Sequence, residues 1–276
     1  MPVTLEGQRP VWRRRTQRAD LAHWAGWLAL VALVVWCWNE MTRDTLWVFV
    51  HDAPKQAADI AGRMMPPRWS YMERLWKPLW DTLNIATLGT LAGTLIAVPV
   101  AFLAARNTTP SALIARPLAL FVIVASRSIN SLIWALLLVA IIGPGLLAGT
   151  IAIALRSIGF VGKLLYEAIE EIDETQVEAV AATGASRWQV MDYAIVPQVL
   201  PAFAGIVVFR WDINIRESTI LGLVGAGGIG MIIIERFRAG LYDQVAFVVL
   251  NVLIVIAIID WMSRKIRERY IGEAAH

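Results

Sequence analysis

Charged and polar side chains interrupt the long apolar runs of this sequence, and they are the residues best suited to handle a polar solute inside a membrane. The apolar run 199–221 contains Arg210, Asp212, Asn214, Arg216 and Glu217. A charge at the middle of a bilayer costs about 2.5–3.5 kcal/mol on insertion scales, so these side chains should face protein or a water-filled path. They could bind a solute, or they could only pair with one another.

An excess of arginine favours an anion as that solute. Arg127 and Arg156 lie in the two preceding apolar runs, so four arginines face two acids within these runs. The candidates for a substrate path are Arg127, Asn130, Arg210, Asp212, Asn214 and Arg216. The alternative is structural, with buried ion pairs that only orient the helices.

Helical spacing sorts the polar residues of 199–221 onto two faces. Arg210, Asn214 and Glu217 are separated by four and then three residues, so they share one face. Asp212 and Arg216 are four apart and share another face. We expect Asp212 to pair with Arg216, and Glu217 to pair with a basic residue of a neighbouring helix.

A polar segment between two apolar runs, residues 178–197, should lie in water. Thr175 and Glu178 have the spacing of a capping box, which predicts a helix that begins near Gln176. Gly184 suits the left-handed residue that ends such a helix.

A second short helix should follow this turn. Ser186 and Gln189 repeat the capping-box spacing. Pro197 lacks an N–H and biases Val196 away from helix, so the second helix should end there. A DNA-binding helix–turn–helix is the alternative, but the segment lacks the dense positive charge that phosphates require.

The polar segment resembles the EAA loop of bacterial ABC-importer permeases. Four residues fall at the spacing of that motif: Glu178, Ala179, Gly184 and Pro197. Three depart from it but remain apolar: Val180, Ala194 and Val196. The resemblance implies a cytoplasmic coupling helix seated in a groove of an ATPase subunit. The coupling residues that it implies are Glu178, Ala179, Ala182, Gly184, Ala185 and Pro197.

A glycine-rich stretch follows the charged run and contains Gly225, Gly227, Gly228 and Gly230. The pattern matches GxGxxG, but a dinucleotide site needs a surrounding βαβ unit in a soluble domain, and here apolar runs flank it. We interpret it as a turn that allows close helix packing. The resemblance to permeases further implies a gate at the outer end of the path.

Composition indicates the class of protein that these motifs belong to. The 276 residues are 58% hydrophobic and 17% charged, and the mean hydropathy is +0.59. These values predict an all-α polytopic membrane protein with about six transmembrane helices. Cys37 is the one cysteine, so neither an internal disulfide nor a cysteine-based metal site is expected. The three histidines are scattered, and we expect no metal site.

Apolar runs predict one membrane domain over residues 1–276. Its parts are a cytoplasmic N-terminus (1–23), a first span (24–42), a periplasmic loop (43–81), a five-span core (82–262) that contains the coupling loop 173–197, and a cytoplasmic tail (263–276). The core spans are expected at 82–105, 117–142, 146–166, 199–221 and 245–261. A cleaved signal peptide is the alternative for the first run, but no small-residue cleavage site follows it.

Basic residues orient these spans. Arginines before the first span, between the second and third spans and after the last span place both termini in the cytoplasm by the positive-inside rule. The net charge of +3 fits basic cytoplasmic loops and does not indicate nucleic-acid binding. We expect a multi-pass protein of the bacterial inner membrane.

Longer stretches resemble phosphonate permeases, with phosphite and hypophosphite permeases as close relatives. The stretches are SRSIN (126–130), VLP (199–201), FRWDINIREST (209–219) and LGLVGAGGIG (221–230). The resemblance implies a second copy of the chain, two ATPase subunits that bind ATP and magnesium, and a periplasmic substrate-binding protein. No GxxxxGK[ST] motif is present, so this chain should bind no nucleotide and no cofactor.

Two other classes remain open at this point. An ion-coupled secondary transporter for anions would use the same arginines without an ATPase. A membrane-embedded enzyme would need paired catalytic groups, for which Asp212 and Glu217 are available but lack a partner motif.

Overall fold

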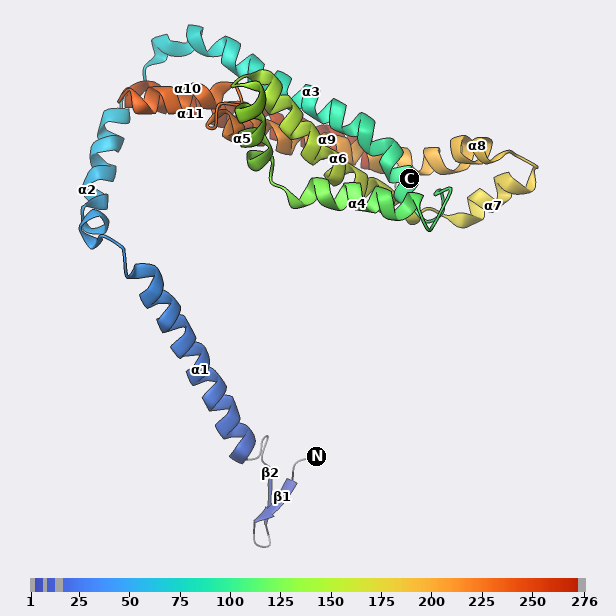
Figure 1. Cartoon of the computed structure of the whole chain (residues 1–276), viewed down its shortest axis with the longest axis horizontal. Helices are drawn as coiled ribbons and strands as arrows, with labels where there is room; N and C mark the ends of the chain where they lie inside the picture. Colours follow the sequence, from blue (N-terminus) through green and yellow to red (C-terminus); the bar gives the residue numbers. More distant parts are fainter. Residues whose placement is uncertain (1–2, 7–8, 13–16, 273–276) are drawn as a thin grey trace. The chain divides into compact units, whose positions relative to one another are not determined.

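The computed structural model describes residues 3–6, 9–12 and 17–272, and it confirms the predicted helical membrane fold (Figure 1). Five helical stretches are long and apolar enough to cross a membrane, and a bent pair of helices would make a sixth. Strands β1 (Val3–Glu6) and β2 (Arg9–Trp12) form an antiparallel hairpin. The chain divides into two compact units, Met1–Ile60 and Ala61–His276.

The first unit contains the hairpin, helix α1 (Gln17–Thr42) and most of helix α2 (Trp47–Met64). The 26 residues of α1 reach about 39 Å, which is more than the roughly 30 Å of a bilayer core. Its described apolar side chains are exposed, as lipid contact requires. Helix α2 lies within the stretch 43–81, which is predicted above as a periplasmic loop.

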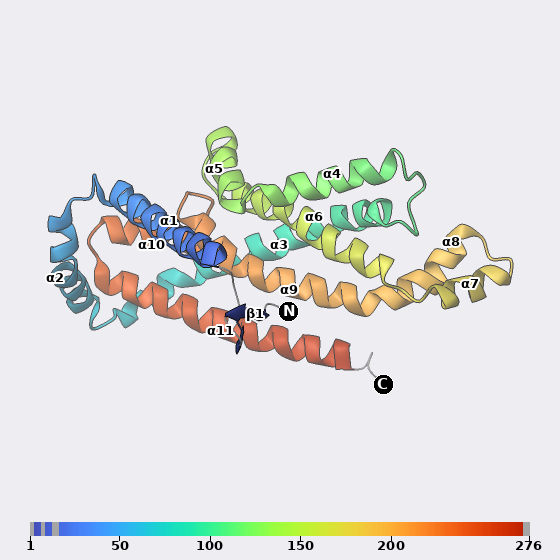
Figure 2. The ribbon, with the colours of Figure 1, turned by 90° about the horizontal axis from the view of Figure 1, so that it is seen from below.

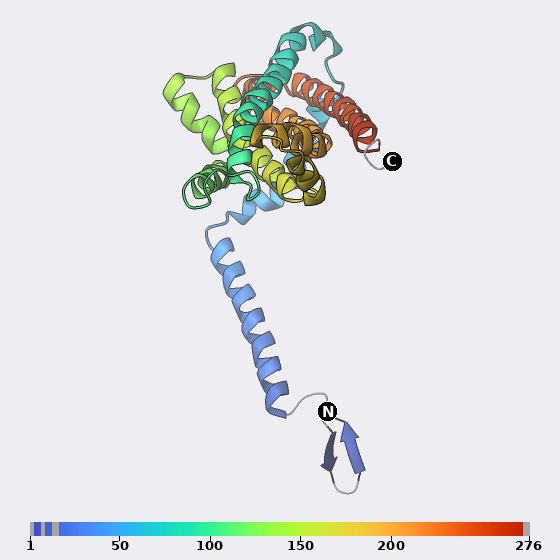
Figure 3. The same cartoon turned by 90° about the vertical axis from the view of Figure 1, so that its right-hand side faces the viewer.

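The second unit contains the remaining elements. They are η1 (Trp69–Tyr71), α3 (Met72–Ala104), α4 (Ala115–Ser128), α5 (Ser131–Ile142), α6 (Leu146–Glu170), α7 (Glu174–Ala182), α8 (Arg187–Val190), the π-helical η2 (Met191–Ile195), α9 (Val196–Gly222), α10 (Ile229–Arg238) and α11 (Tyr242–Gly272). Helix α6 packs against α3, α4, α5 and α9, and α11 packs against α9 (Figure 2). Figure 3 shows α4 and α5 on one side of this bundle and α11 on the other.

Small residues allow α3 and α6 to approach closely, as the GxxxG pair of α3 predicts. A Cβ added to Gly89 would lie 2.7 Å from Ile153 Cγ2 of α6. One added to Gly93 would lie 2.6 Å from Ser157 Cβ and 2.7 Å from the Ala154 carbonyl oxygen. The two backbones therefore meet along this seam, and the seam places Ser157 beside α3.

The predicted third span is wrong as one continuous helix. Helices α4 and α5 are bent by 85° at a short break. Ile129 is extended there, and the Asn130 side chain accepts a hydrogen bond from the N–H of Leu132 at 3.1 Å, which begins α5. The sequence signal for this break was Asn130, because asparagine favours the N-cap position of a helix and here it lies inside an apolar run.

Two predicted helix boundaries are also wrong. Asp173 caps α7 by accepting from the N–H of Thr175 at 2.9 Å, so Thr175 does not begin a capping box. The helix at Pro197 does not end: α8, the π-helical η2 and α9 follow one another without a break. Pro197 directly follows the π-helical turn, where the Val196 N–H bonds to the Met191 carbonyl and the regular α-helical hydrogen-bond pattern is already interrupted.

Replacing Gly93 by alanine should destabilise the protein, because the new methyl group overlaps α6. Overpacking of this kind costs about 1–3 kcal/mol. Thermal unfolding of the purified protein in detergent measures the effect. Gly62→Ala is the matched control, because a Cβ there meets nothing within 4 Å. Equal unfolding temperatures for the two variants would contradict the close α3–α6 contact.

Candidate functional site

A buried polar cluster joins α3, α6 and α9. Arg210 of α9 is only 1% exposed, and its Nε donates to Ser157 Oγ of α6 at 3.1 Å. Asn214 Nδ2, one turn further, donates to the same Ser157 Oγ at 3.0 Å and to Thr90 Oγ1 of α3 at 2.7 Å. The Thr90 hydroxyl in turn donates to the carbonyl of Ala86 at 2.6 Å. The cluster thus fixes α9 against the α3–α6 seam.

One carboxylate, that of Glu217, lies between two guanidinium groups. Its Oε2 is 3.3 Å from Arg210 Nη2, and its Oε1 is 3.3 Å from Arg156 Nε of α6. The Arg210 guanidinium also lies 5.0 Å from the centre of the Phe160 ring. Both predictions for this face are therefore confirmed: its three residues lie together, and Glu217 pairs with a basic neighbour.

This arginine cluster carries a net positive charge and reaches the surface of the chain. The side chains of Arg156 and Glu217 are 28% and 18% exposed. Two guanidinium groups for one carboxylate leave a charge of +1. Arg156 Nη1 also approaches the carbonyl of Ile129 at 3.5 Å, which connects the cluster with the α4–α5 break. An anion could approach it from that side.

Arg216 belongs to a different group on the opposite side of α9. It forms the predicted ion pair with Asp212, and its Nη2 also lies 2.8 Å from Asp260 Oδ1 of α11. Two carboxylates for one arginine leave a charge of −1. Asp260 is not among the predicted path residues, because it lies at the end of the last apolar run, where charge is ordinary. The residues expected in one path are thus divided between two clusters of opposite charge.

Arg127 and Asn130 lie at the α4–α5 break and are exposed. A Cβ on Gly159 would lie 2.7 Å from Arg127 Cγ, so the stem of this arginine crosses α6 at a glycine. Ser126 donates to the carbonyl of Leu155 and accepts from the N–H of Gly159 at 2.8 Å, which holds the end of α4 on α6. Arg127 is therefore placed next to the arginine cluster but outside it.

The α7–α8 segment, residues 173–190, projects from one end of the second unit (Figures 1 and 2). Gly184 has a φ of +80°, as a helix-ending glycine predicts. Ser186 and Gln189 form the predicted capping box. Asp173 accepts hydrogen bonds from the side-chain hydroxyl and from the backbone N–H of Thr175. The hydroxyl has the larger effect, and the two bonds lower the pKa of the Asp173 carboxyl below its ordinary value. Of the predicted coupling residues, Glu178, Ala179, Ala182 and Gly184 are exposed on this segment and Ala185 is half-buried, while Pro197 is exposed beyond the segment.

Two sets of hydrogen bonds connect the α7–α8 segment to the bundle. Arg187 Nη2 donates to the carbonyls of Thr108 and Thr109, in the α3–α4 loop, at 3.0 and 3.1 Å. Gln198 Oε1 accepts from the N–H of Asp173 at 2.9 Å, at the base of the segment. The segment is therefore joined by hydrogen bonds to the α3–α4 loop and to α9.

Two exposed aromatic side chains add to this surface. Trp188 and Tyr193 are 77% and 73% exposed. Neither residue is among the predicted coupling residues. Large exposed aromatic rings in a polar segment are typical of contacts with a partner, and this composition was the signal available.

The glycine-rich stretch packs as expected. Gly225, Gly227 and Gly228 all have positive φ. A Cβ on Gly230 would lie 2.1 Å from the carbonyl oxygen of Thr219, so α9 and α10 meet there without room for a side chain. The N–H of Ile229 donates to Thr82 Oγ1 of α3 at 2.8 Å. The stretch is structural in this chain, and the gate stays a prediction.

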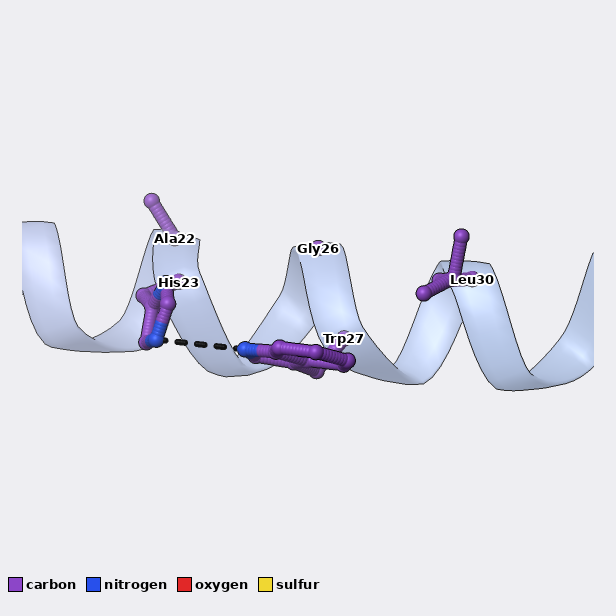
Figure 4. Close-up of a pocket in the computed structure, with 5 residues that line it drawn as sticks. All are labelled: Ala22, His23, Gly26, Trp27 and Leu30. Atoms are coloured by element: carbon purple, nitrogen blue, oxygen red, sulfur yellow. Dashed lines mark hydrogen bonds between the residues drawn. The ribbon is translucent and has the colours of Figure 1, made fainter. Parts of the chain in front are cut away.

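Two hollows on the surface of the described residues do not enclose a polar site. One lies along α1 beside Ala22, His23, Gly26, Trp27 and Leu30, where Trp27 Nε1 donates to His23 Nε2 at 3.2 Å (Figure 4). All five residues belong to one helix, so nothing encloses it. Another hollow is lined only by apolar residues of α3, α6 and α9. Among the described residues, no group of three His, Cys, Asp or Glu side chains could hold a metal ion.

The protein family that this chain matches identifies the class of protein that carries this site. The family described as "Binding-protein-dependent transport system inner membrane component" matches residues 97–272, from the second half of α3 to the end of α11. The chain belongs to this family. It is therefore the membrane-embedded permease component of a binding-protein-dependent ABC importer.

Individual relatives agree with this assignment. The permease is 41% identical over 213 residues to the phosphite transport system permease protein PtxC of Stutzerimonas stutzeri, covering 77% of each chain. It is 40% identical over 205 residues to the phosphate-import permease protein PhnE of Mycolicibacterium smegmatis, covering 74% of this chain and 38% of the relative. Among solved structures, the inward-facing MetNI methionine ABC transporter matches with a TM-score of 0.64 at 22% identity, over 74% of this chain and 99% of that one, which supports the fold.

Glu217→Gln should destabilise the permease, because Arg156 and Arg210 lose the charge between them. Removing one partner of a buried ion pair costs about 3–5 kcal/mol, and the partial exposure here favours the lower end. Thermal unfolding followed by tryptophan fluorescence measures the loss. Glu171→Gln, at an exposed position at the end of α6, is the matched control. If both variants unfold at the same temperature, Glu217 does not hold α9 to α6.

Proposed function

We propose that this permease imports an oxyanion of phosphorus, phosphite or a phosphonate, from the periplasm into the cytoplasm. The observation that carries the proposal is the arginine cluster, Arg210 and Arg156 around Glu217, at membrane depth and open on the Arg156 side. A site with surplus guanidinium groups favours a small tetrahedral anion, because guanidinium donates paired hydrogen bonds to such oxygens. The 41% identity to a phosphite permease supports the same substrate class.

Two copies of the permease form the path, and both termini lie in the cytoplasm. A periplasmic binding protein delivers the anion, and two ATPase subunits bind the α7–α8 segment, with ATP and magnesium held by those subunits. Closure of the ATPase dimer moves the segment, and the spans rotate so that the path opens outward. Hydrolysis restores the inward-open state. The exposed Trp188 and Tyr193 and the residues around Gly184 support this role for the segment.

Uptake into cells tests the substrate. A strain that lacks its own phosphite and phosphonate importers receives this permease together with a binding protein and an ATPase of the same source organism. Radiolabelled phosphite, methylphosphonate, hypophosphite and phosphate are supplied in turn, since one relative is named a phosphate-import permease. Uptake of none of them would contradict the proposal. Uptake without the ATPase would instead support an ion-coupled transporter.

Gly184→Val should abolish coupled uptake while the protein still inserts into the membrane. A Cβ at Gly184 meets nothing within 4 Å, so the cost comes from its positive φ. A left-handed residue other than glycine costs about 1–2 kcal/mol, and more when β-branched. Substrate uptake and ATP hydrolysis measured on the same proteoliposomes should show a roughly tenfold or greater loss of uptake per ATP.

Gly240→Val controls for backbone strain in this experiment. Gly240 also has a positive φ, of +71°, and also has open space around its Cβ position, but it lies in the turn between α10 and α11. If the two variants lose coupling equally, the α7–α8 segment has no special role in it.

Arg216→Ala should lower transport more than it lowers protein abundance, if Arg216 lines the path. The substitution also leaves Asp212 and Asp260 without their shared partner, which destabilises the protein. The double variant Arg216→Ala, Asp260→Asn removes one of these charges. We expect it to restore abundance and not uptake, measured by immunoblot and labelled phosphite. Recovery of both would show that Arg216 only holds α9 to α11.

A further inference from the structure

Helix α2 presents an apolar face whose side chains are exposed from Trp47 to Asp59, while Ile60 and Met64 near its end are half-buried. None of its 18 residues is buried. At 3.6 residues per turn, its apolar residues fill about half of the circumference, and its polar residues lie together on the other side. The apolar face includes Phe49, Ala53, Ala57, Ile60 and Met64, and the polar face includes His51, Asp52, Lys55, Gln56, Asp59 and Arg63.

The first turn of α2 is apolar on every side. Trp47, Val48, Phe49 and Val50 are 47%, 70%, 64% and 49% exposed. Four consecutive helical residues point in four directions about 100° apart. A protein groove would cover only part of this turn, whereas a bilayer surrounds it. The first turn of α2 therefore requires apolar surroundings on every side, whereas the rest of the helix requires them only along its apolar face.

The chain itself brings this turn to a membrane surface. Helix α1 ends at Thr42 and is long and apolar enough to span a bilayer. Four residues separate it from Trp47, so five Cα–Cα steps join Thr42 to Trp47, and an extended chain of this length reaches at most about 18 Å. The start of α2 consequently lies within about 18 Å of the end of α1. Trp36 and Trp38, near the end of α1, are exposed residues of the type that marks the interface.

We propose that α2 lies in the lipid interface, with its first turn and apolar face among the acyl chains and its polar face in water. Interfacial helices have this combination of a wide apolar face and a charged opposite face. The polar face carries two acids, Asp52 and Asp59, and two bases, Lys55 and Arg63. Their charges cancel, so binding is driven by apolar burial and not by anionic lipid. The inference requires only that α1 spans the bilayer; it does not depend on the transported substrate.

Labels on adjacent residues of the two faces test this placement. Ala57 and Gln56 are neighbours in the sequence but lie on the apolar and polar faces, so they form a matched pair. Ala57→Cys and Gln56→Cys are made separately in the permease whose natural cysteine is removed by Cys37→Ser. Each variant then contains a single cysteine. A bimane label is attached, and the permease is reconstituted in phosphatidylcholine vesicles whose acyl chains are brominated. Only variants that unfold in detergent at the temperature of the unlabelled permease are measured, and Ala53→Cys with Lys55→Cys provides a second pair.

Bromine quenches only a label that contacts the acyl chains. We expect the labels at 57 and 53 to be quenched at least about threefold more than those at 56 and 55, with blue-shifted emission. The difference should be the same when anionic phosphatidylglycerol is added. Equal, weak quenching on both faces would place α2 in water and overturn the proposal. A label at 57 that is blue-shifted but not quenched would show cover by protein, such as a second copy, and would overturn it as well.

Discussion

The carboxylate of Glu217, shared by Arg210 and Arg156, is the interaction on which the permease core depends. Buried charges are tolerated at membrane depth only when they have partners, and this carboxylate supplies one to each of two helices. Ser157 can join the same cluster because Gly93 lets α6 approach α3 without a side chain between them. At this point of the bundle, the close packing of α3 and α6 and the polar contacts of Ser157 thus depend on each other.

The two charged clusters give α9 two different sides. Toward α6 it presents surplus positive charge, and toward α11 it presents the Asp212–Arg216–Asp260 group with surplus negative charge. An anion would be attracted to the first side and repelled from the second. The helix also continues, through η2, into the α7–α8 segment. The helix that carries both clusters is therefore mechanically connected to the surface proposed to receive the ATPase.

Local signals in the sequence were sufficient for features that depend on neighbouring residues. The face shared by Arg210, Asn214 and Glu217, the turn at Gly184 and the capping box of Ser186 are all confirmed, because helical spacing and φ preference act within a few residues. The wrong helix boundaries predicted at Pro197 and Thr175 also concern local structure, but at each position two sequence signals favoured different boundaries. Asp173 was the better cap, and a π-helical turn let the chain pass the proline.

The sequence by itself determined the class of protein, the apolar runs and the charges within them, because hydropathy and charge are properties of each residue. The tertiary structure alone decided which charges meet. Asp260 joins Arg216, Arg156 joins Glu217, and Arg127 stays outside, since these contacts join residues far apart in the chain. It also decided that the third apolar run is bent, because the packing of α4 and α5 around α6 selects between a straight and a broken helix.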